Sequence, residues 1–132
     1  MYCNLHKKHD VRNVNFLLQW IKGEDVKNKF GITYPHTVHC IPSGDVMICT
    51  LGDSEGNAAG NFYVIDGKTF ELREKWNKGT EQIKGHDFWY QPRINIMIST
   101  ELGAPNKFTK GFFADDLANG TIITISQLSS ID

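Results

Sequence analysis

The sequence predicts an all-β domain made of repeated antiparallel hairpins, and two observations support this prediction. A stretch at 36–52 is followed by a similar stretch at 86–103. At a constant offset of 50 the two stretches share five identical pairs, His36/His86, Pro42/Pro92, Met47/Met97, Ile48/Ile98 and Thr50/Thr100. Each stretch also places turn residues between short apolar and β-branched runs. A period of about 40–50 residues with short strands is typical of β-propeller blades, so the predicted class is a partial β-propeller.

The chain length limits how much of a propeller it can hold. Its 132 residues are too few for a closed propeller, because four blades of about 40–50 residues each already exceed this length, and the predicted elements make up one and a half to two blades. Each repeat buries its core against its neighbours. We therefore expect an internal segment of a larger propeller, or a chain that self-associates through exposed blade edges.

The first repeat, 36–76, is expected to form one complete blade. Its strand-like runs lie at 37–41, 46–51, 61–65 and 70–76. Turn residues separate them, with Pro42 to Asp45 after the first run and Asp66-Gly67 after the third. The second repeat, 86–126, is expected to be a partial blade with strands at 87–91 and 95–100, a loop at 101–111, a short helix at 112–117 and a strand at 121–126.

The N-terminal third is less regular. Residues 1–13 are polar and are expected to be a tail, whereas 14–21 predicts a buried strand, with a helix left open as the alternative. Together, 14–30 is expected to be the end of a preceding blade. Residues 24–30 are charged and predict one helical turn closed by Gly31.

Composition excludes several classes of function. Fourteen basic residues oppose fifteen acidic ones, which gives no electrostatic basis for nucleic-acid binding. No apolar run approaches a membrane span, and the N-terminus lacks the apolar core of a signal peptide, so a cytoplasmic protein is expected. The three cysteines form no CxxC pair and are expected to be free thiols.

Several strings, in this order and spacing, carry a family resemblance. They are HTVHC at 36–40, SGDVMI at 43–48, LGD at 51–53, GNFYVID at 60–66, TFE at 69–71, DFWYQPR at 87–93, MISTE at 97–101 and APN at 104–106. Across about 17–118 the chain resembles the selenium-binding protein family, whose members act as methanethiol oxidases. The resemblance implies an internal fragment of a seven-bladed propeller.

The same resemblance implies a reaction, in which oxygen and water convert methanethiol to formaldehyde, hydrogen sulfide and hydrogen peroxide. Bacterial members of the family resemble copper enzymes, and selenium association is ascribed to a cysteine pair that is missing here. The ends, 1–13 and 121–132, match poorly, which suggests a truncated or mis-assembled gene product. The family usually carries Tyr rather than His at position 86.

His36 and His39 are the candidate metal ligands, because imidazole suits copper. Residues three apart on a regular strand face opposite sides, so both can bind one ion only if His36 precedes the strand. The alternative is that one histidine caps a loop and the other packs in the core. Cys40 would suit copper(I), although a buried inert thiol is favoured.

Asp87, Trp89, Tyr90 and Arg93 are the candidate lining of a substrate pocket. Aromatic walls suit a small apolar thiol, yet aromatic residues on a strand are more often packing residues of the blade. Glu101 is either an orienting partner of a histidine or a solvated carboxylate. His86 would share a rim with His36 if the blades are related by a regular rotation, but it is left out of the site because of the family pattern.

No catalytic residue and no cofactor-binding residue other than the metal candidates is assigned. The leading hypothesis is a segment of a metal-dependent thiol oxidase that is inactive in isolation. The alternatives are a non-catalytic propeller segment for protein interaction or intracellular protein transport, and an inactive truncated product.

Overall fold

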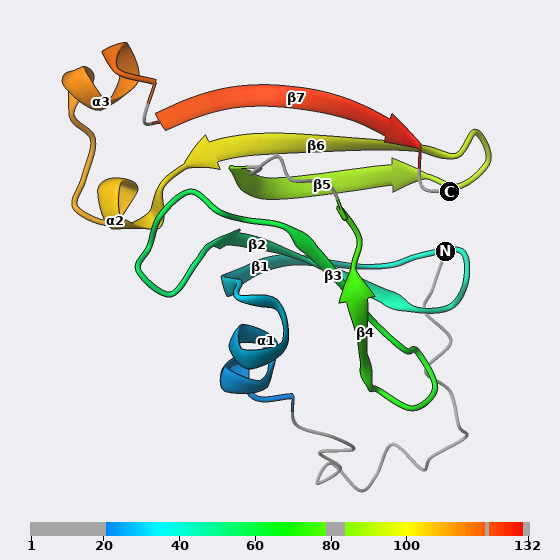
Figure 1. Ribbon diagram of the computed structural model, residues 1–132. Coiled ribbons are helices and arrows are strands. Elements are labelled where there is room, and N and C mark those ends of the chain that lie inside the picture. The colour runs from blue at the N-terminus through cyan, green and yellow to red at the C-terminus, as the bar shows by residue number, and fades with distance from the viewer. Residues whose placement is uncertain (1–20, 79–83, 121, 131–132) are drawn as a thin grey trace, which may run out of the picture.

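The computed structural model describes residues 21–78 and 84–120 in full and the backbone of 122–130. Two antiparallel sheets and three short helices make up this part of the chain (Figure 1). The elements are α1 (Gly23–Phe30), β1 (Thr33–Cys40), β2 (Val46–Gly52), β3 (Phe62–Ile65), β4 (Leu72–Lys75), β5 (Gly85–Gln91), β6 (Ile96–Gly103), α2 (Pro105–Phe108), α3 (Ala114–Ala118) and β7 (Ile122–Ser130). The predicted all-β class agrees with this architecture.

The first sheet has the strand order β1-β2-β3-β4. Its first hairpin pairs Val38 with Ile48 and Cys40 with Val46, so the predicted pairing of these two strands is confirmed. The predicted bounds of 37–41 are too short, because β1 begins at Thr33, which pairs with Gly52. The turn closes through a 2.9 Å hydrogen bond from the Ile41 N–H to the Asp45 carbonyl. Gly44 lies in the turn at φ 89°, a conformation that glycine adopts without steric cost.

A polar cluster fixes the two turns at one end of this sheet. The Arg73 guanidinium donates to Asp45 at 2.7 Å and to Asp66 at 2.6 Å. The backbone N–H groups of Thr69 and Lys68 also donate to Asp66 and, with the Arg73 side chain, lower the pKa of that carboxyl. The turn after β3 is therefore held by charge-assisted hydrogen bonds.

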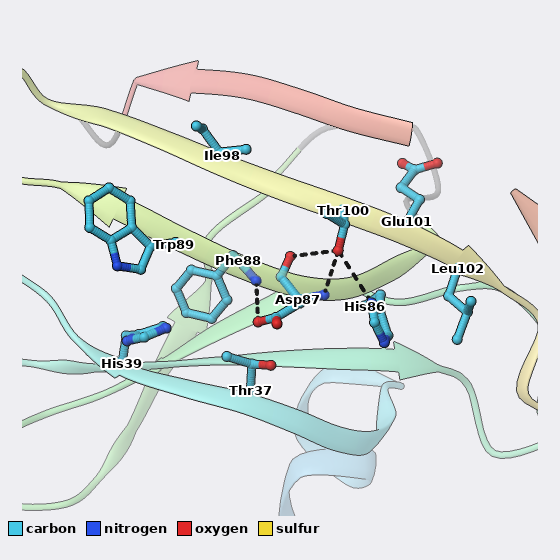
Figure 2. A pocket seen from close by; sticks show the side chains of 10 residues that line it. All are labelled: Thr37, His39, His86, Asp87, Phe88, Trp89, Ile98, Thr100, Glu101 and Leu102. Atoms are coloured by element: carbon cyan, nitrogen blue, oxygen red, sulfur yellow. Dashed lines mark hydrogen bonds between the residues drawn. The ribbon is translucent and has the colours of Figure 1, made fainter. Parts of the chain in front are cut away.

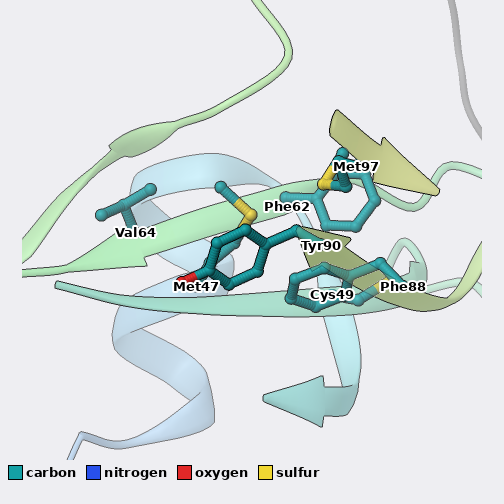
Figure 3. Packing of buried hydrophobic residues seen from close by; sticks show 7 residues of the cluster. All are labelled: Met47, Cys49, Phe62, Val64, Phe88, Tyr90 and Met97. Atoms are coloured by element: carbon teal, nitrogen blue, oxygen red, sulfur yellow. The ribbon is translucent and has the colours of Figure 1, made fainter. Parts of the chain in front are cut away.

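Strand alternation gives the first sheet two apolar faces. One face carries Met47, Cys49, Phe62 and Val64, which pack against the second sheet (Figure 3). The opposite face carries Tyr63 and Ile65 among others and packs against α1. The first sheet therefore lies between a helix and a second sheet, and both of its faces are covered.

Helix α1 occupies the described part of the range predicted to end a preceding blade. Gly31 ends it at φ 73°, and its N–H donates to the Lys27 carbonyl at 2.7 Å, so the predicted closure of this helix is confirmed. Val26 is the buried residue of the helix. The strand predicted at 14–21 and the tail predicted at 1–13 lie outside the described residues, apart from Ile21. Within the described ranges, no helix is long and apolar enough to cross a membrane.

The second sheet has the order β5-β6-β7. The loop predicted at 101–111 is wrong in part, because β6 continues to Gly103 and α2 follows from Pro105. One non-local and one local cause explain this. The backbone of β7 pairs along β6 as far as Gly103, and Pro105 is favoured at the start of a helix. The short helix predicted near 112–117 and the strand predicted near 121–126 correspond to α3 and the first half of β7.

The structure corrects how the two repeats correspond. Both first strands carry a β-bulge at matching positions, between Pro35 and Val38 in β1 and between Gly85 and Phe88 in β5. Val38 pairs with Ile48, whereas Phe88 pairs with Ser99. The first strands of the two repeats, β1 and β5, therefore correspond at an offset of 50 residues. Their second strands, β2 and β6, correspond at an offset of 51, because the turn between β5 and β6 has one residue more than the turn between β1 and β2.

This correspondence places the repeats in the same orientation. His39 and Met47 face the second sheet, and their counterparts Trp89 and Ile98 face away from the first sheet, where they are 56% and 44% exposed. Met97 is consequently the counterpart of Val46 rather than of Met47. Each sheet presents the same face toward the next.

Two close backbone approaches fix the sheets relative to one another. A Cβ on Gly85 would lie 2.7 Å from the Thr50 carbonyl oxygen, so β5 approaches β2 closely only because residue 85 has no side chain. The loop after β2 also contacts α2, since the Asn106 N–H donates to the Gly56 carbonyl at 2.9 Å. Pro105 is fully buried in this contact region.

Candidate functional site: the hollow between the inner edge strands

The edge strands β1 and β5 of the two sheets lie side by side and enclose a hollow of about 570 Å³ (Figure 2). Apolar and aromatic side chains form much of its wall, with histidine and carboxylate side chains between them. The lining residues are Thr37, His39, His86, Asp87, Phe88, Trp89, Ile98, Thr100, Glu101 and Leu102. A hollow of this size that combines an apolar wall with convergent polar side chains is typical of a small-molecule site.

The bulge in β1 places two histidines on one face of the strand. An inserted residue between Pro35 and Val38 changes the side-chain alternation, so His36 and His39 both face β5. The His36 ring stacks on the His86 ring at 4.8 Å, with 30° between the planes. The His39 ring meets Phe88 edge-on at 5.0 Å. The sequence objection that these histidines face opposite sides is therefore wrong.

Asp87 is the charged centre of the site. A hydrogen bond from the Thr37 side chain is the largest cause of the lowered pKa of its carboxyl, and the Phe88 N–H also donates to it at 2.7 Å. The nearby His36 and His86 lower this pKa further through their charge. Asp87 is therefore a carboxylate over the neutral pH range.

The Thr100 hydroxyl on β6 contacts both the side chain of His86 and the backbone of Asp87 on the paired strand β5. Its hydroxyl accepts from the Asp87 N–H at 3.2 Å and lies 3.3 Å from His86 Nδ1 (Figure 2). His36 has a similar arrangement, with Nδ1 3.0 Å from the Thr37 hydroxyl. Each ring of the stacked pair is thus oriented by a threonine.

The family resemblance implies a copper ion, and the donor groups of this site fit such an ion only in part. Imidazole suits copper, but the His36 and His39 rings have different partners, and no group of three or more His, Cys, Asp and Glu side chains in the described ranges is arranged to hold a metal ion. The residues present therefore supply imidazole ligands without completing a coordination shell. Metal binding by the His36 and His39 pair stays a prediction.

The cysteines supply no reactive thiol in the described site. Cys40 is disulfide-bonded, so the expectation of free thiols is wrong for this residue. Cys49 is free but fully buried between the sheets. Burial, followed by the charge of Asp87, raises the pKa of the Cys49 thiol to about 12, so it remains protonated and inert.

The four predicted pocket residues divide between two neighbouring hollows. Asp87 and Trp89 line the hollow described above. Tyr90 and Arg93 line a second hollow of about 970 Å³, which shares His39 and Trp89 with the first. Tyr90 is also only 9% exposed and belongs to the core between the sheets, as the packing alternative predicted.

Sequence reasoning left out the polar lining residues His86, Thr37 and Thr100 and the apolar lining residues Phe88, Ile98 and Leu102. The identity of His36 and His86 at the repeat offset was the one signal that pointed to the stacked pair. Nothing in the sequence indicated the threonines, because their role depends on the two bulges and on the pairing of β5 with β6.

The fold and the site together define a class, a pair of like-facing antiparallel sheets with a histidine-containing hollow at their inner edges. Comparison with known proteins then identifies the family. The model of the 56kDa selenium binding protein (SBP56) family matches residues 3–129, and the chain belongs to this family.

Named relatives support this assignment. A methanethiol oxidase of Xenopus laevis is 50% identical over 93 residues, which cover 70% of this chain and 20% of that protein. Selenium-binding protein 1 of Arabidopsis thaliana is 41% identical over 105 residues, 79% of this chain and 21% of that protein. The chain thus spans about a fifth of the length of these relatives.

A solved structure has a similar fold. The X-ray structure of a hypothetical selenium-binding protein from Sulfolobus tokodaii superposes with a TM-score of 0.66 at 26% identity. The superposition covers 85% of this chain and 27% of that chain.

Proposed function

We propose that the chain is a segment of a β-propeller, with 36–76 as one blade and 86–126 as part of the next. The like-facing stack of the two sheets and the matching bulges support this proposal. On this model β1 and β5 are neighbouring innermost strands and their shared hollow opens on the propeller channel. In a propeller of seven blades, this chain would make up one and a half to two of them.

We further propose that this segment forms part of a small-thiol site in a methanethiol oxidase of the selenium-binding protein family, located in the cytoplasm. Relatives named methanethiol oxidase are 48–50% identical to this chain over 93 residues. The observation that carries the proposal is the hollow beside the His36–His86 pair, whose wall combines Phe88, Trp89 and Ile98 with imidazole groups.

The residues of the chain would divide the work as follows. Trp89 and Ile98 would contact the methyl group of methanethiol, because both are apolar, line the hollow and are half exposed on the face of the second sheet that is turned away from the first. His39, which lines the hollow from β1, would accept the thiol proton. Copper bound at the imidazoles would supply the redox chemistry with oxygen, and selenium association is assigned to the full-length family rather than to this segment.

A binding experiment tests this proposal directly. Methanethiol is titrated anaerobically into the 132-residue chain while the indole N–H resonance of Trp89, assigned with Trp89→Phe, is followed by NMR. We expect that resonance to shift and that of Trp76, which packs on Phe62 in the core, to stay unchanged. Equal shifts of both resonances, or none, would refute a thiol site in the hollow.

Oxidation of methanethiol is tested separately from its binding. We expect no peroxide or sulfide from the isolated chain with copper, methanethiol and oxygen, because its imidazoles leave the coordination shell incomplete. Turnover by a verified monomer, abolished in His39→Ala, would show that these two sheets alone carry the chemistry.

One observation favours a second function, protein interaction. Phe112, Phe113 and Leu117, in and just before α3, are 73%, 56% and 57% exposed. Adjacent exposed apolar side chains are typical of interaction surfaces. We propose that this patch supports self-association or partner binding, which sedimentation of Phe112→Ser at several concentrations tests.

A further inference from the structure

Arg93 carries the positive charge of the second hollow, which has a volume of about 970 Å³. Its guanidinium forms no ion pair or hydrogen bond with any residue in the described ranges, and only its backbone N–H is engaged, with the Gln91 side chain at 3.4 Å. Arg73 is the contrast, because the carboxylates of Asp45 and Asp66 neutralise it beside the corresponding turn of the first sheet. The charge of Arg93 is therefore available to a ligand.

The two neighbouring hollows differ in charge. Carboxyl side chains of Asp87 and Glu101 line the first, whereas the described lining of the second contains Arg93 and no Asp or Glu. The hollows share His39 and Trp89, which Figure 2 shows at the end of the first hollow that lies away from Glu101. An anion would therefore be repelled from the first hollow and attracted to the second.

Tyr90 offers the second hollow another hydrogen-bond donor. The residue is only 9% exposed, yet its hydroxyl has no hydrogen-bond partner among the described residues. No fully buried side-chain oxygen or nitrogen in those ranges lacks a partner, so this hydroxyl is open to solvent, and Tyr90 lines the second hollow. A guanidinium and a hydroxyl on one hollow are donors from which a carboxylate accepts.

The wall beside these donors is apolar. Trp89 is 56% exposed and Val38, on the neighbouring strand β1, is 57% exposed, and both line the second hollow. Covering such side chains with an apolar group removes their surface from water, which is favourable. A ligand that uses the whole hollow would therefore combine an apolar body with an anionic end.

We infer that the second hollow binds a small organic carboxylate, with the anion at Arg93 and Tyr90 and the apolar body against Trp89 and Val38. A guanidinium matches a carboxylate geometrically, because it donates two parallel hydrogen bonds to the two oxygens. The site goes beyond the proposed thiol site, since neither Arg93 nor Tyr90 lines the first hollow.

A titration with 3-phenylpropionate, an acid with an aromatic body, tests the inference. The whole chain is labelled with ¹⁵N, and the indole N–H of Trp89 and the Nε–H of Arg93 are followed by NMR. We expect both resonances to shift and that of Trp76, in the core, to stay unchanged. The matched ligand is 3-phenylpropionamide, which has the same shape without the charge and should bind at least about fivefold more weakly.

Three substitutions separate the donors from a general effect of charge. Arg93→Gln should weaken binding of 3-phenylpropionate about tenfold, and Tyr90→Phe, which removes only the hydroxyl, about threefold to fivefold. Lys110→Gln is the matched control, because it removes an exposed positive charge that lines neither hollow, and it should leave the affinity unchanged. The urea midpoint of Arg93→Gln should equal that of the parent, since its guanidinium has no partner among the described residues.

Equal affinities for the acid and the amide would overturn the inference, and so would an equal effect of Arg93→Gln and Lys110→Gln. An unchanged Trp89 resonance would overturn it as well. The probe contains no thiol, so its failure is distinct from a failure of the thiol-site proposal. A response to methanethiol without a response to 3-phenylpropionate refutes this inference alone, and the reverse result supports this inference and refutes the thiol site alone.

Discussion

Phe62 links the two sheets, and its truncation should destabilise the whole chain. The residue is 2% exposed, and its ring makes edge-on contacts with Trp76 at 5.6 Å and with Phe88 of the second sheet at 5.1 Å. Replacing a buried phenylalanine by alanine costs about 3–5 kcal/mol, because apolar burial is lost and a cavity remains. We therefore expect Phe62→Ala to lower the free energy of unfolding by about 4 kcal/mol.

Urea unfolding followed by far-ultraviolet circular dichroism measures this effect. At a slope of about 2 kcal/mol per molar urea, the midpoint should fall by roughly 2 M. Phe112→Ala is the matched control, since Phe112 is 73% exposed and its truncation should change stability by less than about 0.5 kcal/mol. If Phe62→Ala does not fold, Phe62→Leu should still lose about 1 kcal/mol with the edge-on contacts.

A double-mutant cycle between Phe62 and Phe88 isolates the contact between the sheets. We expect a coupling energy of about 0.5–1.5 kcal/mol, the usual range for an edge-to-face aromatic pair. Equal destabilisation by Phe62→Ala and Phe112→Ala, or no coupling across the sheets, would refute the packing described above.

Three further predictions follow from single residues. Gly67→Ala should lower the free energy of unfolding by about 1–3 kcal/mol, because its Cβ would lie 1.8 Å from a carbonyl oxygen of the neighbouring turn. Gly23→Ala is the control, since its Cβ would meet nothing within 4 Å and should not destabilise the chain. Equal urea midpoints for the two variants would contradict this prediction. Cys49, whose thiol pKa is raised to about 12, should resist a thiol reagent at pH 8 until urea unfolds the chain, and fast labelling of the native chain would disprove its burial. The lowered pKa of Asp66 means that its stabilisation is present above its unfolded pKa of about 3.9 and is lost as pH falls toward the folded value. Asp66→Asn should therefore flatten the loss of stability below about pH 4, and an unchanged acid profile would rule out this linkage.

Local features were predictable from the sequence because they depend on neighbouring residues. The hairpin of β1 and β2 follows from apolar runs around a turn with Pro42 and Gly44, and α1 ends at Gly31 because glycine readily adopts the left-handed conformation. The 50-residue repeat correctly indicated two similar units. It also placed His36 and His86 at equivalent positions, which the matching bulges confirm.

Contacts between the sheets were decided only by the tertiary structure. Neither bulge has a sequence signal that fixes which residue is inserted, yet each insertion reverses the direction of the side chains beyond it. That reversal puts His36 and His39 on one face, and the close approach at Gly85 brings His86 to within stacking distance of His36. The sequence alone therefore determined the hairpin of β1 and β2, the turn at its end and the family resemblance. The pairing of the histidines depends on non-local registration of two sheets, which no local pattern encodes.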